Sequence, residues 1–177
     1  MTHSTPTAAV RFLRAVVPPL GALLIALMMA CTALWVFTRN NDFPLNSQPE
    51  ETSKAGQIMS DTQRRNFNHP MLILESANLV RQWFGVPNEM RQMVIAGRST
   101  SAGLAAIGVF ALALAGYWGF GFRGLLFGGT IAALCPPLLV YAHYFKEDAA
   151  LAGGVALAVL GMAWVVNAKK FWQQLIG

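Results

Sequence analysis

The sequence has little charge and almost no cysteine. Only 12% of its 177 residues are Asp, Glu, Lys or Arg, about half the share in an average soluble domain. Its two cysteines, Cys31 and Cys135, lie in apolar stretches without a CxxC spacing or a neighbouring histidine. This pattern excludes a cysteine-based metal or redox motif. We interpret both cysteines as small apolar packing residues.

The chain also lacks a basic patch interleaved with aromatic residues, the pattern that binds single-stranded nucleic acid. Its net charge of +5 would suggest such a partner in a soluble protein. Here the basic residues flank apolar runs, as they do at the ends of membrane helices. The expected partners are therefore membrane lipids and not nucleic acid.

Apolar residues are concentrated in four runs, each near the ~20 residues that cross a bilayer. Between positions 99 and 145 the only charged residue is Arg123. We predict four transmembrane helices, at residues 15–37, 99–120, 124–144 and 149–168. The expected fold class is all-α: a polytopic membrane protein, with residues 1–177 forming a single membrane domain.

Basic residues in short loops and at the termini predict the orientation, because such residues stay in the cytoplasm. They precede the first run, separate the second from the third and follow the fourth; they are Arg11, Arg14, Arg123, Lys169 and Lys170. All lie on one side if both termini are cytoplasmic. The first run exceeds the ~7–15 apolar residues of a signal peptide, so we expect a retained anchor. The predicted location is a bacterial-type inner (plasma) membrane, with multiple passes and an outer loop at residues 39–98.

The long outer loop carries signals for short helices. Pro49 suits the first position of a helix, and Glu50 and Glu51 follow where the helix dipole favours acids. This pattern predicts a helix over residues 49–60. The sequence at 88–96 predicts another helix, which leads into the second span.

An apolar stripe predicts one more helix in this loop, over residues 70–84. Leu72, Leu79 and Trp83 recur at helical spacing, with polar residues largely on the other side. Such an amphipathic helix is typical of segments that lie in the membrane interface. The loop is therefore expected to fold as short interfacial helices on the outer surface.

Two acidic pairs, Glu50-Glu51 and Glu147-Asp148, are predicted on the same outer side. Acids at one interface suit a general base or metal ligation, so a divalent cation stays open as a cofactor. The alternative is that each pair only favours the N-terminus of its helix. In that case Lys54 would pair with Glu50 four residues away, and Lys146 with a neighbouring acid.

His69 and Arg64 also allow two interpretations. His69 precedes Pro70 and could cap a helix, lie in the interface or contact a substrate. The Arg64-Arg65 pair could contact lipid head groups, or could hold a phosphate through forked hydrogen bonds.

Four short stretches, in this order, resemble the amino-terminal part of the C-type-fold membrane glycosyltransferases that use polyprenyl-phosphate sugars. These families include the protein O-mannosyltransferases and the aminoarabinose transferases. Residues 48–58, Gln-Pro-Glu-Glu-Thr-Ser-Lys-Ala-Gly-Gln-Ile, resemble a first-loop motif of the form His-Pro-Asp-Glu-Pro-Ser-Lys. Residues 68–72, Asn-His-Pro-Met-Leu, resemble a His-Pro-Pro-Leu element. Residues 96–103 resemble the arginine-containing start of the second span, and residues 136–150 resemble the end of the third span with its acidic turn.

The resemblance implies a reaction and a site. Glu50 or Glu51 would act as the base toward an acceptor hydroxyl, with inversion of the sugar's anomeric carbon; the family usually has Asp where Glu50 stands. Asp148 matches the acid that follows the third span. The expected substrate-binding residues are Lys146, Arg98 and Arg64, which would meet the donor phosphate, and His69.

The resemblance covers about the first third of a family member, so we expect the chain to be an amino-terminal portion or a reduced relative, with a partner membrane subunit as one way to complete the fold. The main alternative is a non-enzymatic four-span partner or assembly subunit. A transporter fragment is a third hypothesis, but it would more naturally carry ionisable groups near the membrane midplane. Under the enzyme hypothesis, Glu50 or Glu51 approaches Asp148 in one outer pocket near Lys146 and Arg98.

Overall fold

The computed structural model describes residues 8–45, 47–60 and 71–167, with the side chains of residues 8–18 excepted. Every regular element in these ranges is an α-helix, which confirms the predicted all-α class. The helices are α1 (Ala8–Phe37), α2 (Pro49–Met59), α3 (Met71–Phe84), α4 (Met90–Ala133), α5 (Pro136–Ala142) and α6 (Glu147–Asn167).

Three helices are long and apolar enough to cross a membrane: α1 over Pro19–Phe37, α4 and α6. Many of their large apolar side chains are exposed, such as Met28 on α1 at 69% and Val166 on α6 at 83%. A helix that is apolar all round belongs either in a protein core or in lipid. These helices indicate a multi-pass membrane protein, as predicted from the sequence.

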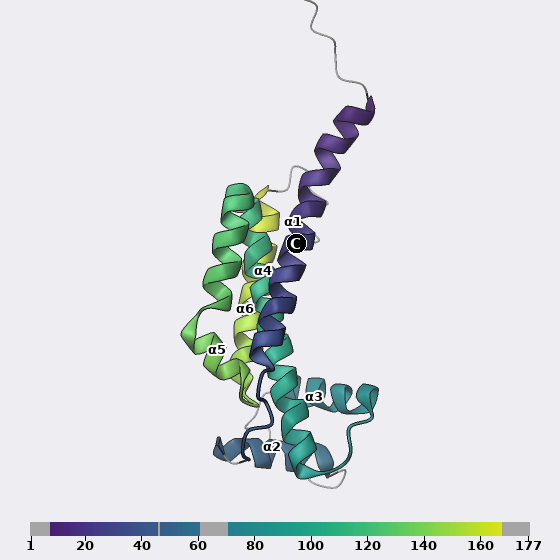
Figure 1. Cartoon of the computed structure of the whole chain (residues 1–177), viewed down its shortest axis with the longest axis vertical. Helices are drawn as coiled ribbons and strands as arrows, with labels where there is room; N and C mark the ends of the chain where they lie inside the picture. The colour runs from purple at the N-terminus through teal and green to yellow at the C-terminus, as the bar shows by residue number, and fades with distance from the viewer. Residues whose placement is uncertain (1–7, 46, 61–70, 168–177) are drawn as a thin grey trace, which may run out of the picture.

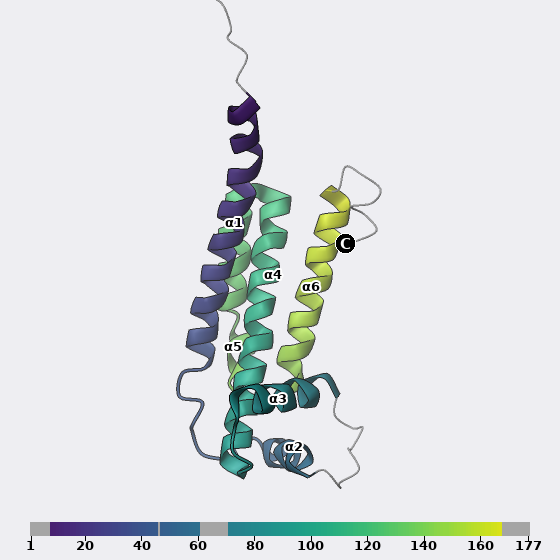
Figure 2. The same ribbon diagram turned by 90° about the vertical axis from the view of Figure 1, so that its right-hand side faces the viewer.

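α4 reverses direction at Gly121, so its 44 residues form a helical hairpin and not a single rod (Figures 1 and 2). Gly121 has φ 65° and ψ −154°, a conformation that is open to glycine and strained for other residues. The limbs approach closely through glycine: a Cβ on Gly116 would lie 2.2 Å from the carbonyl oxygen of Gly124. The chain therefore turns where the sequence predicted a turn, between residues 120 and 124.

The second limb of α4 ends at Ala133, well before the predicted end at residue 144. Pro136 and Pro137 have no amide hydrogen, so they cannot continue the hydrogen bonding of a preceding helix. The chain breaks at Leu134 and Cys135, and α5 begins with the two prolines in its first turn. The predicted helix at 124–144 is therefore wrong as one element and consists of two segments.

α2 and α3 lie across one end of the bundle, roughly perpendicular to the long helices (Figures 1 and 2). Their bounds differ from the predicted 49–60 and 70–84 by one residue each. The helix predicted at 88–96 is not a separate element, because α4 begins at Met90 and continues without a break into the bundle. We call the end formed by α2, α3 and the first turns of α4 and α6 the capped end.

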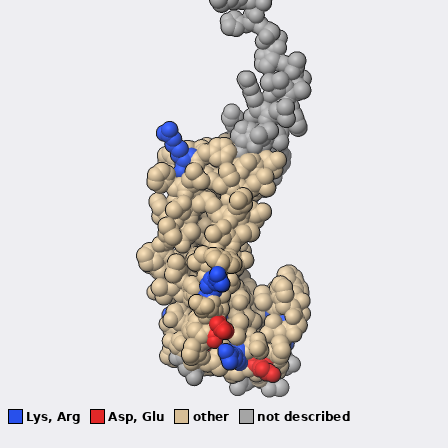
Figure 3. Space-filling model, in the orientation of Figure 1, with Lys and Arg blue, Asp and Glu red and all other residues tan. Residues whose placement is uncertain are grey.

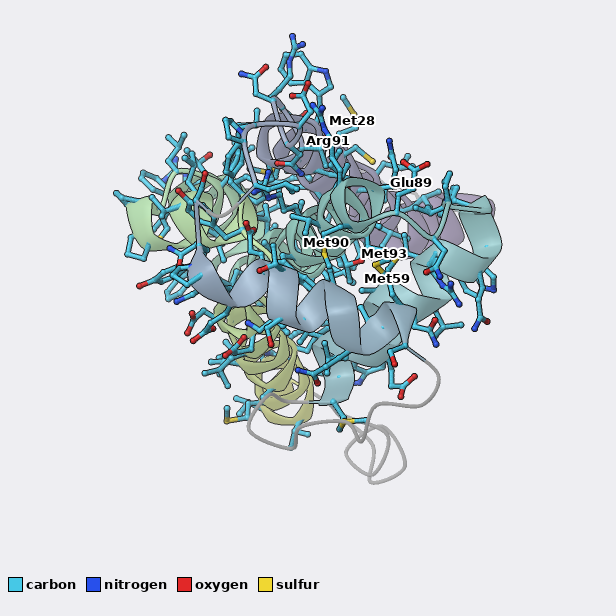
Figure 4. The ribbon with its side chains drawn as sticks, turned by 90° about the horizontal axis from the view of Figure 1, so that it is seen from below. Met28, Met59, Glu89, Met90, Arg91 and Met93 are labelled. Carbon is cyan, nitrogen blue, oxygen red and sulfur yellow. The ribbon has the colours of Figure 1, made fainter. Side chains whose placement is uncertain are left out.

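A small core holds the capped end together. α2 and α3 both pack on the first turns of α4. Seen from below, α2 crosses this end with Met59 beside Met93 of α4 (Figure 4). Met93 is fully buried in a cluster that includes Ile73 of α3 and Phe145, the residue that precedes α6 by two positions. This packing fixes α2 relative to the start of α6, where the charged residues gather.

Candidate functional site

A buried ion pair joins α2 to α4 at the capped end. Nε of Arg98 donates to Oε1 of Glu51 at 2.9 Å, and Nη2 donates to Oε2 at 2.7 Å. Both side chains are completely buried. This forked, charge-assisted geometry is among the strongest kinds of hydrogen bonding in proteins. A charge pair survives in an apolar interior only when its remaining donors and acceptors are also satisfied.

The rest of the Arg98 guanidinium is satisfied by the segment that follows α1. Nη1 donates to the carbonyl oxygens of Asn41 at 2.9 Å and Phe43 at 2.8 Å, and Nη2 donates to that of Pro44 at 3.3 Å. The guanidinium carbon lies 3.6 Å from the centre of the Phe43 ring. These bonds hold residues 41–44 against α4.

Glu51 also reaches the segment between α5 and α6. The Phe145 amide donates to Oε1 of Glu51 at 2.9 Å. The Phe145 ring packs on Gly97, where any Cβ would lie 2.4 Å from a ring carbon, so this packing needs glycine at 97. The Ser101 hydroxyl and the Lys146 backbone exchange hydrogen bonds of 3.3 and 3.2 Å. The Glu51–Arg98 pair thus ties together four segments: α2, residues 41–44, α4 and the turn before α6.

Lys54 forms a second buried charge centre. Its ammonium donates to the Phe145 carbonyl oxygen at 3.2 Å, to Oε2 of Glu50 at 3.3 Å and, in a short bond, to Oε2 of Glu147. The Lys54 side chain is fully buried, whereas those of Glu50 and Glu147 are 50% and 30% exposed. All three ammonium hydrogens have an acceptor. The predicted ion pair between Lys54 and Glu50 is confirmed, and the two acidic pairs meet through Glu50 and Glu147.

Asp148 takes part in a separate, more exposed pair. Its Oδ2 lies 3.7 Å from Nζ of Lys146, and the two side chains are 43% and 25% exposed. The predicted pairing of Lys146 with a neighbouring acid is therefore confirmed. The Lys146 ammonium is also 5.6 Å from the centre of the Tyr141 ring. Tyr141 and Asp148 both line the mouth of an apolar groove along α6.

The structure thus divides the predicted site residues into two groups. Glu51 and Arg98 are buried and bonded to each other, while Glu50, Lys146 and Asp148 are accessible. Glu147, and not Asp148, shares a cation with Glu50. The remaining candidates, Arg64 and His69, lie outside the described residues.

The sequence analysis did not single out Glu147 as a partner of Lys54, and it gave Lys54 no role beyond its ion pair with Glu50. A signal for the burial of Lys54 was present, because Glu51, Lys54 and Ile58 are spaced three and four residues apart and so lie on one face of α2. All three are buried. No comparable local signal pointed to the backbone amide of Phe145 as a partner of Glu51, since the two are 94 residues apart.

Charge is concentrated at the capped end. On the face shown in Figure 3, the acidic side chains appear only in the lower part of the molecule, with basic side chains beside them. Within residues 8–45, 47–60 and 71–167, no three His, Cys, Asp or Glu side chains are placed to hold a metal ion. A divalent cation therefore stays a prediction. Comparison of the chain with protein-family models, with curated proteins and with solved structures gives no match.

Proposed function

We propose that the chain is the amino-terminal membrane portion of a glycosyltransferase that moves a sugar from a polyprenyl phosphate to an acceptor hydroxyl. The observation that supports this function is the gathering of accessible acids around two lysines at one end of an apolar helical bundle. Glu50 and Glu147 meet at Lys54, and Asp148 pairs with Lys146 beside them. A lipid phosphate lies at the same depth as such an end, because its hydrocarbon chain remains in the bilayer.

The proposal includes four membrane crossings, made by α1, the first limb of α4, the second limb with α5, and α6. The reversal at Gly121 supports two crossings within α4. Both termini are cytoplasmic in this proposal, and the capped end faces outward at a bacterial-type inner membrane. α2 and α3 lie in the outer interface, which agrees with their orientation across the bundle (Figure 2).

Glu50 is the better of the two first-loop candidates for the general base. Half of its side chain is exposed, and Lys54 holds it through one ion pair. A carboxylate has about four acceptor positions, so an acceptor hydroxyl can still approach. Glu51 has no exposed surface, and its oxygens already accept from Arg98 and Phe145. We therefore assign Glu51 and Arg98 as positioning residues that hold α2 on α4.

The Glu50 carboxylate takes the proton of the acceptor hydroxyl as its oxygen attacks the anomeric carbon. The bond from that carbon to the phosphate oxygen breaks, and its electron pair leaves with the phosphate. Lys146 offsets the charge on the leaving phosphate. A positioned general base contributes about 10²–10⁴-fold to such a rate.

Preference for a lipid phosphate tests the function without requiring turnover. The 177-residue chain in detergent micelles is mixed with equal amounts of undecaprenyl phosphate and undecaprenol, and native mass spectrometry measures which lipid remains bound. We expect the phosphate to be retained over the alcohol, and Lys146→Gln to reduce that preference. Arg39→Gln is the control, because Arg39 is an exposed cation over the Trp35 ring. Equal retention of the two lipids by the unaltered chain would instead favour a non-enzymatic partner subunit.

A further inference from the structure

The break between α4 and α5 leaves backbone acceptors without donors. Pro137 has no amide hydrogen, so it cannot bond the carbonyl oxygen of Ala133, four residues earlier. The amide of Leu138 likewise makes no bond to the carbonyl oxygen of Leu134. Among the residues that the structure describes, no donor bonds either oxygen. The last carbonyl groups of a helix are met by water, by side chains or by a ligand, so the surroundings of the break decide which of these serves here.

The break lies at the depth of the hydrocarbon core. Leu134 stands 13 positions after the reversal at Gly121, a rise of about 20 Å at 1.5 Å per residue, and the core is ~30 Å thick. Cys135 lines a cavity together with Gly108, which is near the middle of the span predicted at 99–120. At this depth neither water nor a lipid chain offers a donor, and irregular backbone is tolerated only against protein or a water-filled cavity.

A groove beside the break opens these acceptors to an outside partner. It measures about 430 Å³ and lies between α1 on one side and the second limb of α4 with α5 on the other. Ala133 and Leu134 both line it. Leu134 is 68% exposed, so the described helices leave this end of α4 uncovered. We call this cavity the α1–α5 groove.

The α1 wall of the groove has the form of a helix-packing surface. Its lining residues include Ile25, Met28, Thr32 and Val36, which recur at three- and four-residue steps on one face of α1. A stripe with this spacing packs against the ridges of a second helix. From Ile25 to Val36 the stripe is about 17 Å long. The groove therefore offers an incoming helix about three turns of continuous apolar contact.

The polar groups in the groove define the chemistry of its partner. Thr130 lines the groove, and its hydroxyl has no hydrogen bond among the described residues. The Thr32 hydroxyl, by contrast, already donates to the Met28 carbonyl oxygen at 2.9 Å. The free set is therefore two acceptors, from Ala133 and Leu134, and one hydroxyl. A side-chain amide has two donor hydrogens and one acceptor oxygen, which is the complement of this set.

We propose that the α1–α5 groove binds a transmembrane helix that carries an asparagine or glutamine near its middle. The amide hydrogens of that residue donate to the carbonyl oxygens of Ala133 and Leu134, and its oxygen accepts from the Thr130 hydroxyl. Side-chain amides join helices within membranes through such bonds. No lining residue of the groove belongs to the capped end, so this inference stands independently of the proposed function.

A pair of synthetic peptides tests the proposal with a defined probe. Each is a leucine–alanine helix of about 21 residues, long enough to cross a bilayer; one has asparagine at its centre and the other has leucine. A trace of dansyl-labelled peptide is mixed with the 177-residue chain in micelles, and energy transfer from the tryptophans of the chain gives the dissociation constant. We expect the asparagine peptide to bind about three- to eight-fold more tightly, as one or two interhelical hydrogen bonds of average strength require.

Matched threonine variants assign this preference to the groove. Thr130→Val removes the free hydroxyl and keeps the shape of the side chain, so the preference for the asparagine peptide should fall about three-fold. Thr32→Val is the control, because the Thr32 hydroxyl lines the same groove but bonds within its own helix. Pro137→Ala should also lower the preference, since it provides the amide hydrogen that the Ala133 carbonyl oxygen lacks. Equal effects of the two threonine variants would overturn the proposal.

A photoreactive leucine beside the central residue of the asparagine peptide locates the contact. Crosslinks at Met28 or Leu134 support the groove, whereas crosslinks at Leu151, which is exposed on α6, place the helix elsewhere and overturn the assignment. Equal binding of the two peptides would show that the free carbonyl oxygens recruit no donor. If native mass spectrometry finds a dimeric chain that neither peptide dissociates, a second copy fills the groove, and the proposal of an amide-bearing helix is overturned.

Discussion

Replacing Arg98 with methionine would remove the guanidinium that joins α2, α4 and residues 41–44. Methionine keeps an apolar side chain of similar length, so the change isolates the charge and its hydrogen bonds. The buried Glu51 carboxylate would then keep only the Phe145 amide as a donor. Leaving one member of a buried ion pair unpaired costs about 3–5 kcal/mol. The carbonyl oxygen of Asn41 would also lose its buried donor, so we expect the upper part of that range.

The free energy of unfolding is measured by titrating the micelle-bound chain with sodium dodecyl sulfate and following tryptophan fluorescence. Arg39→Met is the matched control, because Arg39 is exposed and its guanidinium carbon lies 4.2 Å from the centre of the Trp35 ring. An exposed cation–π contact contributes only about 0.5–1 kcal/mol. We therefore expect a difference of about 2 kcal/mol or more between the two arginine variants.

A double variant tests the cause of the loss. Glu51→Gln alone should destabilise the chain, because it leaves the Arg98 charge without its carboxylate. In the Arg98→Met background the same change removes an unpaired buried charge, so it should restore part of the lost stability. Two results would refute the ion-pair reasoning: a loss in Arg98→Met no larger than in Arg39→Met, or the same effect of Glu51→Gln in both backgrounds.

Three further predictions follow from the same contacts. Lys54→Met should speed amide hydrogen exchange in α2, because it removes the ammonium that both Glu50 and Glu147 contact. Lys146→Met is the control and should leave this exchange unchanged. Equal exchange in the two variants would show that the Lys54 contacts do not hold α2. Gly116→Ala should lower the midpoint temperature of thermal unfolding, since its Cβ would lie 2.2 Å from the Gly124 carbonyl oxygen. Gly119→Ala is the control and should shift the midpoint little, because a Cβ at Gly119 would meet open space. A similar midpoint for both variants would contradict the close approach of the two limbs of α4. Cysteine introduced at Ser53 or at Glu147 should react with an impermeant thiol reagent added outside intact cells, and protection of both positions would reverse the proposed orientation.

Local signals predicted α2 and α3 well. Pro49 fixed the start of α2 because proline fits the first helical position, and the apolar spacing from Leu72 to Trp83 placed α3 within a residue of its bounds. The end of α4 was missed although the sequence contained the cause. Pro136 and Pro137 have no amide hydrogen, so a preceding helix cannot continue its hydrogen bonding through them.

The site was less predictable, because its partners are distant in the sequence. The family resemblance suggested that Glu51 and Arg98 were functional, but their bond spans 47 residues and depends on how α2 packs on α4. One general rule pointed toward their burial: an arginine that begins an apolar span needs an anionic partner. The choice of that partner among Glu50, Glu51, Glu147 and Asp148 needed the tertiary structure.

The order of synthesis constrains how the capped end can form. Glu51 accepts hydrogen bonds from Arg98 and Phe145, which lie 47 and 94 positions later in the chain. At a synthesis rate of about 5–20 residues per second, Arg98 is added to the chain roughly 2–10 s after Glu51. Phe145 is added roughly 5–20 s after Glu51. An unpaired carboxylate is too costly to bury during that interval, so the buried face of α2 must remain hydrated. Its docking therefore follows insertion of the α4 hairpin, and the arrival of Phe145 completes the assembly.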